Sequence, residues 1–248
     1  MRGGGVGSFT KPEHLNAETW DRCDALSVYG DFFGTRRLCP EPPGDRKFRL
    51  MVVAALRAVW VHLTDPRSRA AVEAAERYAD DYEIDPIEEA DEPAFQAIED
   101  AEDANGFDDP VESAVVLATA AWQSREGVML NDASIRGVAY WAWIVSELES
   151  PGVADRSQEQ AKALHLRLFH DIFPNPFRPV AIDQAWLTPT VLLLAAGIYA
   201  DRAHDRLPIL ADALQEAGCE HSDLLAHCHS DGQHVRGCWA VDLLLGKG

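Results

Sequence analysis

Residues 45–63 read DRKFRLMVVAALRAVWVHL, and this stretch is the clearest indication of the fold class. Its apolar side chains recur at helical spacing and cover more than half the circumference of a helix: Leu50, Val53, Ala54, Leu56, Val59, Trp60 and Leu63. A helix of this kind is buried on most sides. We therefore predict a core helix over 45–63, whose solvent-exposed edge carries Arg46, Lys47, Arg49 and Arg57.

Helix boundary signals recur along the chain after this stretch. Thr64 or Asp65 before Pro66, and Thr188 before Pro189, are typical of an N-cap followed by proline at the first helical position. Gly218 predicts a left-handed stop after the helix at 207–217. We predict an all-α fold, an irregular multi-helix bundle or short α-solenoid-like array of roughly 9–11 helices without significant sheet. A single helical domain is expected over 13–248, after a flexible tail at 1–12.

The formal charge of −19 is concentrated in one window of the chain. Residues 80–112 hold fifteen acidic side chains and no Lys or Arg, so this window supplies −15 and the remainder only −4. Such a surface repels nucleic-acid phosphates and anionic lipid headgroups, so we expect neither nucleic-acid nor membrane binding. An acidic excursion at 80–112 suits a protein partner that is itself basic. We expect Glu88, Glu89, Asp91 and Glu92 to contact this partner.

Cysteine content and hydropathy indicate a compartment. Five cysteines, an odd number, fit reduced thiols better than a disulfide framework. The longest apolar run, at 191–200, is ten residues and falls short of the roughly 20 needed to span a bilayer. The first ten residues are glycine-rich and lack the apolar segment of a signal peptide. We expect a cytoplasmic protein.

Several short phrases of the sequence occur together in a known pattern. They are DRKFRL at 45–50 leading to Trp60, NPFRPV at 175–180, LPILADAL at 207–214 and HVRGCW at 234–239. In these phrases the chain resembles an uncharacterised family of bacterial cytosolic helical proteins without an established activity. It departs from that pattern at Ala55 and Leu56, where adjacent cysteines are expected, and at His229, where arginine is expected. The resemblance implies a helical fold and no particular chemistry.

The last 46 residues, 203–248, hold the residues that could bind a metal ion, with five of the nine histidines and three of the five cysteines. A structural zinc site takes four converging Cys or His ligands. His234 and Cys238 stand at i, i+4 and could share one face of a helix. A zinc site is therefore one hypothesis, with Cys219, Cys228, His234 and Cys238 as ligands and His227 as a fifth candidate. Cysteines that act only as small buried hydrophobes are the alternative, without any cofactor.

Two further functions remain open from the sequence. A helical protein-interaction or regulatory module uses most of the chain, because the acidic window and the rigid loop at 175–179 offer two separate surfaces. An enzyme would depend on Cys238 as nucleophile and His234 as base. The sequence contains no GxSxG, HExxH, P-loop or dinucleotide-binding pattern, so it assigns no catalytic residue beyond this pair.

Overall fold

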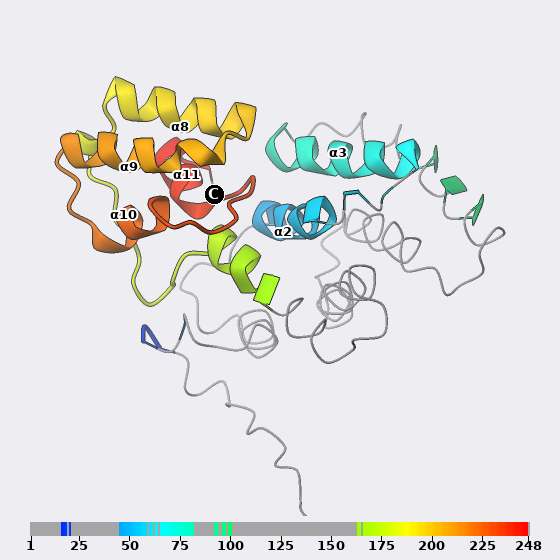
Figure 1. Ribbon diagram of the computed structural model, residues 1–248, viewed down its shortest axis with the longest axis horizontal. Helices are drawn as coiled ribbons and strands as arrows, with labels where there is room; N and C mark the ends of the chain where they lie inside the picture. Colours follow the sequence, from blue (N-terminus) through cyan, green and yellow to red (C-terminus); the bar gives the residue numbers. More distant parts are fainter. Residues whose placement is uncertain are drawn as a thin grey trace, which may run out of the picture.

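The computed structural model describes two helical parts of the chain and a few residues around them (Figure 1). The described residues are 16–18, 20, 45–58, 60, 61, 63, 65–81, 92, 93, 96, 97, 99, 100, 163, 164 and 166–247. They are 69% helical and contain no strand, which confirms the prediction of an all-α fold. The predicted tail at 1–12 lies outside them, and the prediction of a single domain stays a prediction.

The first helical part is an antiparallel pair, α2 (Asp45–Ala58) and α3 (Pro66–Asp81), whose ribbons lie side by side in Figure 1. The sequence determines where α3 begins, since the Asp65 carboxylate accepts a hydrogen bond from the Arg67 backbone N–H at 2.7 Å. The helix α2 ends before the predicted boundary at residue 63. Both helices bury small and branched apolar side chains: Leu50, Val53, Ala54 and Leu56 of α2, and Ala71, Val72, Ala75 and Ala79 of α3.

The second helical part is formed by α8 (Pro189–Asp201), α9 (Leu207–Glu216), α10 (Ser222–Cys228) and α11 (Trp239–Leu245). Short 3-10 turns, η4 (Gln184–Trp186) and η5 (His204–Arg206), precede α8 and α9. The predicted signals hold: the Thr188 hydroxyl caps α8, and Gly218 ends the α9 region with a φ of +87°. These helices enclose one apolar core that includes Leu210, Leu214, Leu224, Cys228 and Val241.

A helical segment at 166–172 lies between the two parts and joins them. Its Leu168, Phe169 and Ile172 are buried together with Met51 and Ala54 of α2. Trp20, which is 1% exposed, packs on Phe169 with ring centroids 5.4 Å apart. Because this segment contacts α2 on one side and carries an aspartate toward the C-terminal helices on the other, it positions the site described below.

The prediction of a solvent-exposed edge on the first core helix is wrong at three of its four positions. Arg46, Lys47 and Arg49 are 4%, 8% and 9% exposed, because carboxylates from elsewhere in the chain cover at least the first two. Arg46 Nη1 lies 2.7 Å from Asp242 Oδ2 of α11, and Lys47 Nζ lies 2.5 Å from the same oxygen. Only Arg57 is half-buried, and it pairs with Glu76 of α3. Charged side chains thus form part of the interior between the two helical parts.

Asp80, near the end of α3, is the second acceptor in this interior. It receives hydrogen bonds from Arg46, from the Tyr199 hydroxyl at 2.5 Å, from Arg236 and from Lys247 at 3.2 Å. Although burial opposes it, these donors lower the pKa of the Asp80 carboxyl. We call this set the Asp80–Asp242 network: Arg46, Lys47, Asp80, Tyr199, Arg236, Asp242 and Lys247.

Among the described helices, none is long and apolar enough to cross a membrane. This agrees with the absence of a membrane-length apolar run in the sequence.

Candidate metal site

Four side chains with metal-binding atoms converge where the 166–172 segment meets the C-terminal helices. They are Asp171, His227, His234 and Cys238, and their ligand atoms all lie within 4.8 Å of one another. We call them the Asp171 cluster. Asp171 and Cys238 are buried, whereas His227 and His234 are partly buried. A carboxylate, two imidazoles and a thiol at this spacing are the donor types that a transition metal binds.

Asp171 is the centre of the cluster. Its Oδ2 accepts a hydrogen bond from the Val235 backbone N–H at 2.8 Å, which fixes the carboxylate with Oδ1 toward the two histidines. Burial alone would raise the pKa of this carboxyl, but hydrogen bonds from His227 and His234 hold the pKa of Asp171 at about 2. The carboxylate is therefore ionised and directed into the cluster at neutral pH.

His234 lies between two acceptors. Its Nδ1 is 2.5 Å from Asp171 Oδ1, while its Nε2 faces the Ser230 hydroxyl at 3.2 Å and the Ser230 carbonyl oxygen at 3.4 Å. Burial opposes the charged imidazole, but the adjacent carboxylate raises the pKa of His234 above its ordinary value. A metal-bound histidine usually donates its other ring N–H to a carboxylate or a backbone carbonyl. In His234 the nitrogen that faces a carbonyl is Nε2, so Nδ1 is well placed to bind a metal.

His227 connects the carboxylate to the thiol. Its Nε2 lies 3.2 Å from Asp171 Oδ1 and 3.2 Å from Cys238 Sγ. Its other nitrogen, Nδ1, accepts a hydrogen bond from the Trp239 indole N–H at 3.1 Å. An accepting ring nitrogen carries no proton, so in this structure the ring proton resides on Nε2 and points into the cluster.

Cys238 stands directly before α11, and only 1% of it is exposed. Burial raises the pKa of its thiol well above the usual range, even though the backbone N–H groups of Val241 and Ala240 act in the opposite direction. Without a metal the group is a neutral thiol. The same N–H groups would stabilise a thiolate once a cation neutralised it.

The distances between the ligand atoms fit tetrahedral coordination of an ion in part. Zinc bonds of about 2.0 to 2.3 Å place neighbouring tetrahedral ligand atoms roughly 3.3 to 3.6 Å apart. Two contacts of His227 Nε2, both 3.2 Å, are close to this value. The contact between His234 and Asp171 is a hydrogen bond of 2.5 Å and would have to open by roughly 0.8 Å to admit an ion.

Two of the four zinc ligands expected from the sequence lie in the Asp171 cluster, and two do not. His234 and Cys238 belong to the Asp171 cluster, together with His227, the fifth candidate. Cys219 and Cys228 are not among its four members and lie in the C-terminal apolar core. Cys228 is nevertheless near enough for the charge of Asp171 to add to the effect of burial, which together raise the pKa of Cys228 to about 12. Of the predicted partner-binding residues, Glu92 is exposed, while Glu88, Glu89 and Asp91 lie outside the described residues.

Sequence reasoning missed Asp171, which is 63 residues from its partner His234. No spacing rule links positions so far apart. One local signal was present. Asp171 lies on a helix between Phe169 and Ile172, which form an apolar stripe together with Leu168. A carboxylate beside such a stripe is buried only when a partner neutralises it, and that partner can be sought among the unassigned histidines.

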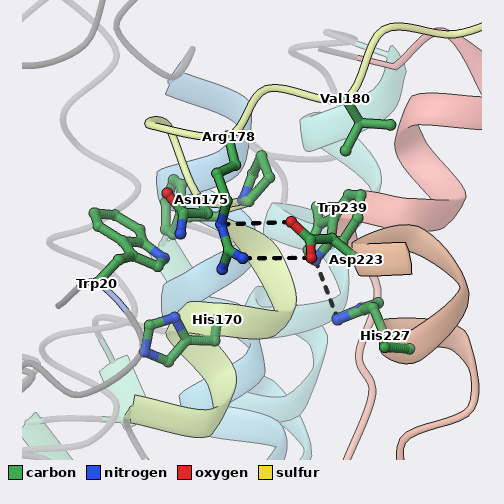
Figure 2. A pocket seen from close by; sticks show the side chains of 11 residues that line it. Trp20, His170, Asn175, Arg178, Val180, Asp223, His227 and Trp239 are labelled. Atoms are coloured by element: carbon green, nitrogen blue, oxygen red, sulfur yellow. Dashed lines mark hydrogen bonds and ion pairs between the residues drawn. The ribbon is translucent and has the colours of Figure 1, made fainter. Parts of the chain in front are cut away.

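A pocket of about 200 Å³ adjoins the cluster (Figure 2). His227 and Trp239 form the wall it shares with the cluster, and their hydrogen bond is drawn in Figure 2. The opposite wall carries Trp20 and His170. Arg178 and Asp223 form an ion pair between these walls, with 3.5 Å between Arg178 Nε and Asp223 Oδ2. The pocket therefore brings aromatic rings and one pair of opposite charges next to a candidate metal ligand.

No family model matches the chain. Curated proteins and solved structures were compared as well, and neither comparison found a significant match. Function must therefore be argued from the site itself, and the family resemblance drawn from the sequence stays an expectation.

Proposed function

We propose that this protein binds a single zinc ion through Asp171, His227, His234 and Cys238, and that the ion ties the C-terminal helices to the segment at 166–172. The observation that carries the proposal is the convergence of four different ligand side chains, one of them a buried thiol, within 4.8 Å. A site with four protein ligands has no open position for a substrate, which is typical of structural zinc.

The donor set selects among metals. Calcium and magnesium take oxygen ligands almost exclusively, and only one of these four side chains offers oxygen. Two imidazoles and a thiolate favour zinc or a similar late transition metal. The ionised Asp171 supplies one negative charge, and a metal-bound Cys238 thiolate would supply a second, so the divalent ion would be neutralised in a buried place.

The ion would join segments that are distant in sequence. Asp171 belongs to the segment that packs on α2, whereas Cys238 directly precedes α11. His227 lies in the last turn of α10, and His234 lies in the connection that follows. Zinc would therefore fix the loop from 229 to 238, which has little regular structure of its own among the described residues. Metal binding would then contribute to the free energy of folding.

Zinc binding has one structural requirement. A neutral His227 that binds zinc through Nε2 must carry its proton on Nδ1, which here faces the Trp239 N–H. Two donors cannot share a hydrogen bond, so the indole of Trp239 must move when the metal enters. Tryptophan fluorescence should report this change directly.

Elemental analysis of untagged full-length protein tests the proposal. We expect about one zinc per chain and its loss from Asp171→Asn and Cys238→Ser. Cys219→Ser is the matched control, because Cys219 is equally buried but is not among the four ligands. Circular dichroism identifies variants that fail to fold. Folded protein without zinc, or loss of zinc from Cys219→Ser alone, contradicts the proposed ligand set.

The other two functions remain predictions with weaker support. The described residues Glu92, Glu99 and Asp100 are exposed, which suits the acidic partner surface. Neutralising Glu88, Glu89, Asp91 and Glu92 together should weaken binding of a basic protein, and unchanged binding would end that hypothesis. For an enzyme, His227 and not His234 contacts the thiol, and the sulfur is buried with a raised pKa, which disfavours a nucleophilic role.

A further inference from the structure

A tight turn at residues 235–238 links three of the proposed zinc ligands. Its first residue, Val235, follows His234, and its last residue is Cys238. The Val235 carbonyl accepts a hydrogen bond from the Cys238 backbone N–H at 3.0 Å, and the Val235 N–H donates to Asp171 Oδ2 at 2.8 Å. The conformation of this turn therefore decides where the Cys238 thiol lies relative to the Asp171 carboxylate.

Gly237 gives the turn its shape. Its φ is +93°, whereas Arg236 before it has no positive φ. This combination is that of a type II turn, whose third residue is usually glycine because a side chain strains a positive φ. A Cβ on Gly237 would also lie 2.9 Å from Leu50 Cδ1 and 3.2 Å from Leu50 Cβ, closer than the roughly 3.5 to 4.0 Å at which carbon atoms pack. The backbone conformation and the close contact with α2 thus both require glycine here.

Lys47 of α2 holds the same turn through a hydrogen bond. Its ammonium group donates to the Gly237 carbonyl at 3.0 Å and to Asp242 Oδ2 at 2.5 Å. Lys47 is buried, so water competes little for this bond. Because Lys47 and Leu50 are three residues apart on a helix, they reach Gly237 from one face of α2.

The same helix supports the other side of the candidate site. Met51 and Ala54 of α2 are buried together with the segment at 166–172, and Asp171 of that segment accepts the hydrogen bond from the turn. The helix α2 therefore contacts both the Asp171 side and the Cys238 side, although none of its residues is among the four proposed ligands.

We propose that Lys47 and Gly237 are positioning residues of the zinc site, and that zinc affinity depends on the contact between α2 and the 235–238 turn. This inference rests on the proposed zinc site. With the turn held on α2, the Cys238 thiol already lies within 4.8 Å of the other ligand atoms, so less order has to be created when the ion binds. Since linkage is reciprocal, zinc strengthens the contact with α2 by the same factor.

Two variants of the full-length protein test this inference, with zinc affinity measured by competition with a chromophoric chelator. Gly237→Ala should bind zinc about tenfold more weakly, because backbone strain and the contact with Leu50 both oppose the bound geometry. Lys47→Met should bind about fivefold more weakly, the worth of one net hydrogen bond. Circular dichroism checks folding, and should one variant fail to fold, the other decides.

Each variant has a matched control. Gly232→Ala changes a glycine of the same loop, where an added Cβ meets nothing closer than Ser230 Oγ at 3.6 Å. Arg46→Met removes the other cation bound to Asp242, and no hydrogen bond of Arg46 to a described residue reaches Gly237. Both controls should keep their zinc affinity within about twofold of the parent value.

The spectrum of bound cobalt distinguishes positioning from a purely stabilising role. A residue that only stabilises the fold leaves the sulfur-to-cobalt charge-transfer band of the folded protein unchanged, whereas displacement of Cys238 weakens the band for each cobalt bound. We expect a weaker band in Gly237→Ala and in Lys47→Met, and the parent band in both controls.

The possible failures are distinguishable. If the parent protein binds cobalt with the band, and Gly237→Ala and Lys47→Met match it in affinity and spectrum, the positioning role is overturned while the zinc site stands. Controls that lose as much zinc affinity as these variants overturn it too. A parent protein that binds neither zinc nor cobalt overturns the zinc site and the positioning role together.

Discussion

Two buried polar clusters hold this protein together, and they differ in the groups that neutralise their aspartates. In the Asp80–Asp242 network the partners are the guanidinium and ammonium groups of Arg46, Lys47, Arg236 and Lys247. In the Asp171 cluster the partners are two imidazoles, with a thiol beside one of them, and these are groups that bind a transition metal. The first cluster contains no imidazole or thiol, whereas the second can exchange protons for an ion.

The largest expected effect is in the first cluster. Asp242→Ala leaves Arg46 and Lys47 buried without their shared acceptor, which should cost about 3 to 5 kcal/mol of unfolding free energy. Urea unfolding measures this, with Asp212→Ala at an exposed position of α9 as the control, where a change within about 0.5 kcal/mol is expected. The folded fraction of Asp242→Ala should keep its zinc. If it lost zinc as Asp171→Asn does, the two clusters would not be independent.

Metal removal should have the next largest effect, and only through the Asp171 cluster. With free zinc at about 100 times its dissociation constant, chelation should lower the unfolding free energy by about 2.7 kcal/mol. Asp171→Asn, already without zinc, should unfold at the same urea concentration with and without chelator. A chelator effect of equal size in that variant would place the ion elsewhere.

The metal-free protein should show a pH optimum that depends on the Asp171 cluster. The pKa of Asp171 falls from 3.8 to about 2 on folding. Its contribution to the unfolding free energy, about 2 kcal/mol, is therefore present above pH 4 and is lost as pH falls toward 2. The pKa of His234 is raised, so its contribution is complete below about pH 6.5 and is lost as pH rises through the folded value. Urea unfolding across this range should show both declines. Asp171→Asn should flatten them, and an unchanged profile would show that other groups control it.

The smallest expected effect concerns Trp239. Replacing it with Phe removes the indole N–H that competes for His227 Nδ1, so zinc affinity should rise by about fivefold, the worth of one net hydrogen bond. Competition with a chromophoric chelator measures the affinity. Trp186→Phe, at a partly buried tryptophan outside the Asp171 cluster, is the control and should change nothing. Weaker zinc binding in Trp239→Phe would contradict the tautomer argument.

The helices were predictable because their signals are local. The Thr188-Pro189 and Asp65-Pro66 caps, the apolar spacing around Leu50 and the left-handed Gly218 each act within a few residues, and the structure uses all of them. The buried arginine and lysine were not predictable in this way. Arg46 and Lys47 are neutralised by Asp242, 196 and 195 residues away, and only the tertiary fold brings them together.

The candidate site follows the same rule. Cys238 and His234 were found from their spacing, whereas Asp171 comes from a different segment and replaces the cysteines expected from sequence. Cys219 and Cys228 carry the right atoms, but helix packing directs them into the apolar core. Composition therefore indicated which region to test, and only the fold indicated which side chains converge there.

The spectrum of the cobalt-substituted protein tests the central claim most directly. Cobalt(II) takes the place of zinc and reports tetrahedral geometry and thiolate ligation through its visible and near-ultraviolet absorption. The account predicts a tetrahedral spectrum with a sulfur-to-cobalt charge-transfer band in the parent protein and in Cys219→Ser, and no such band in Cys238→Ser. A parent protein without the band, or a band that survives Cys238→Ser, would contradict it.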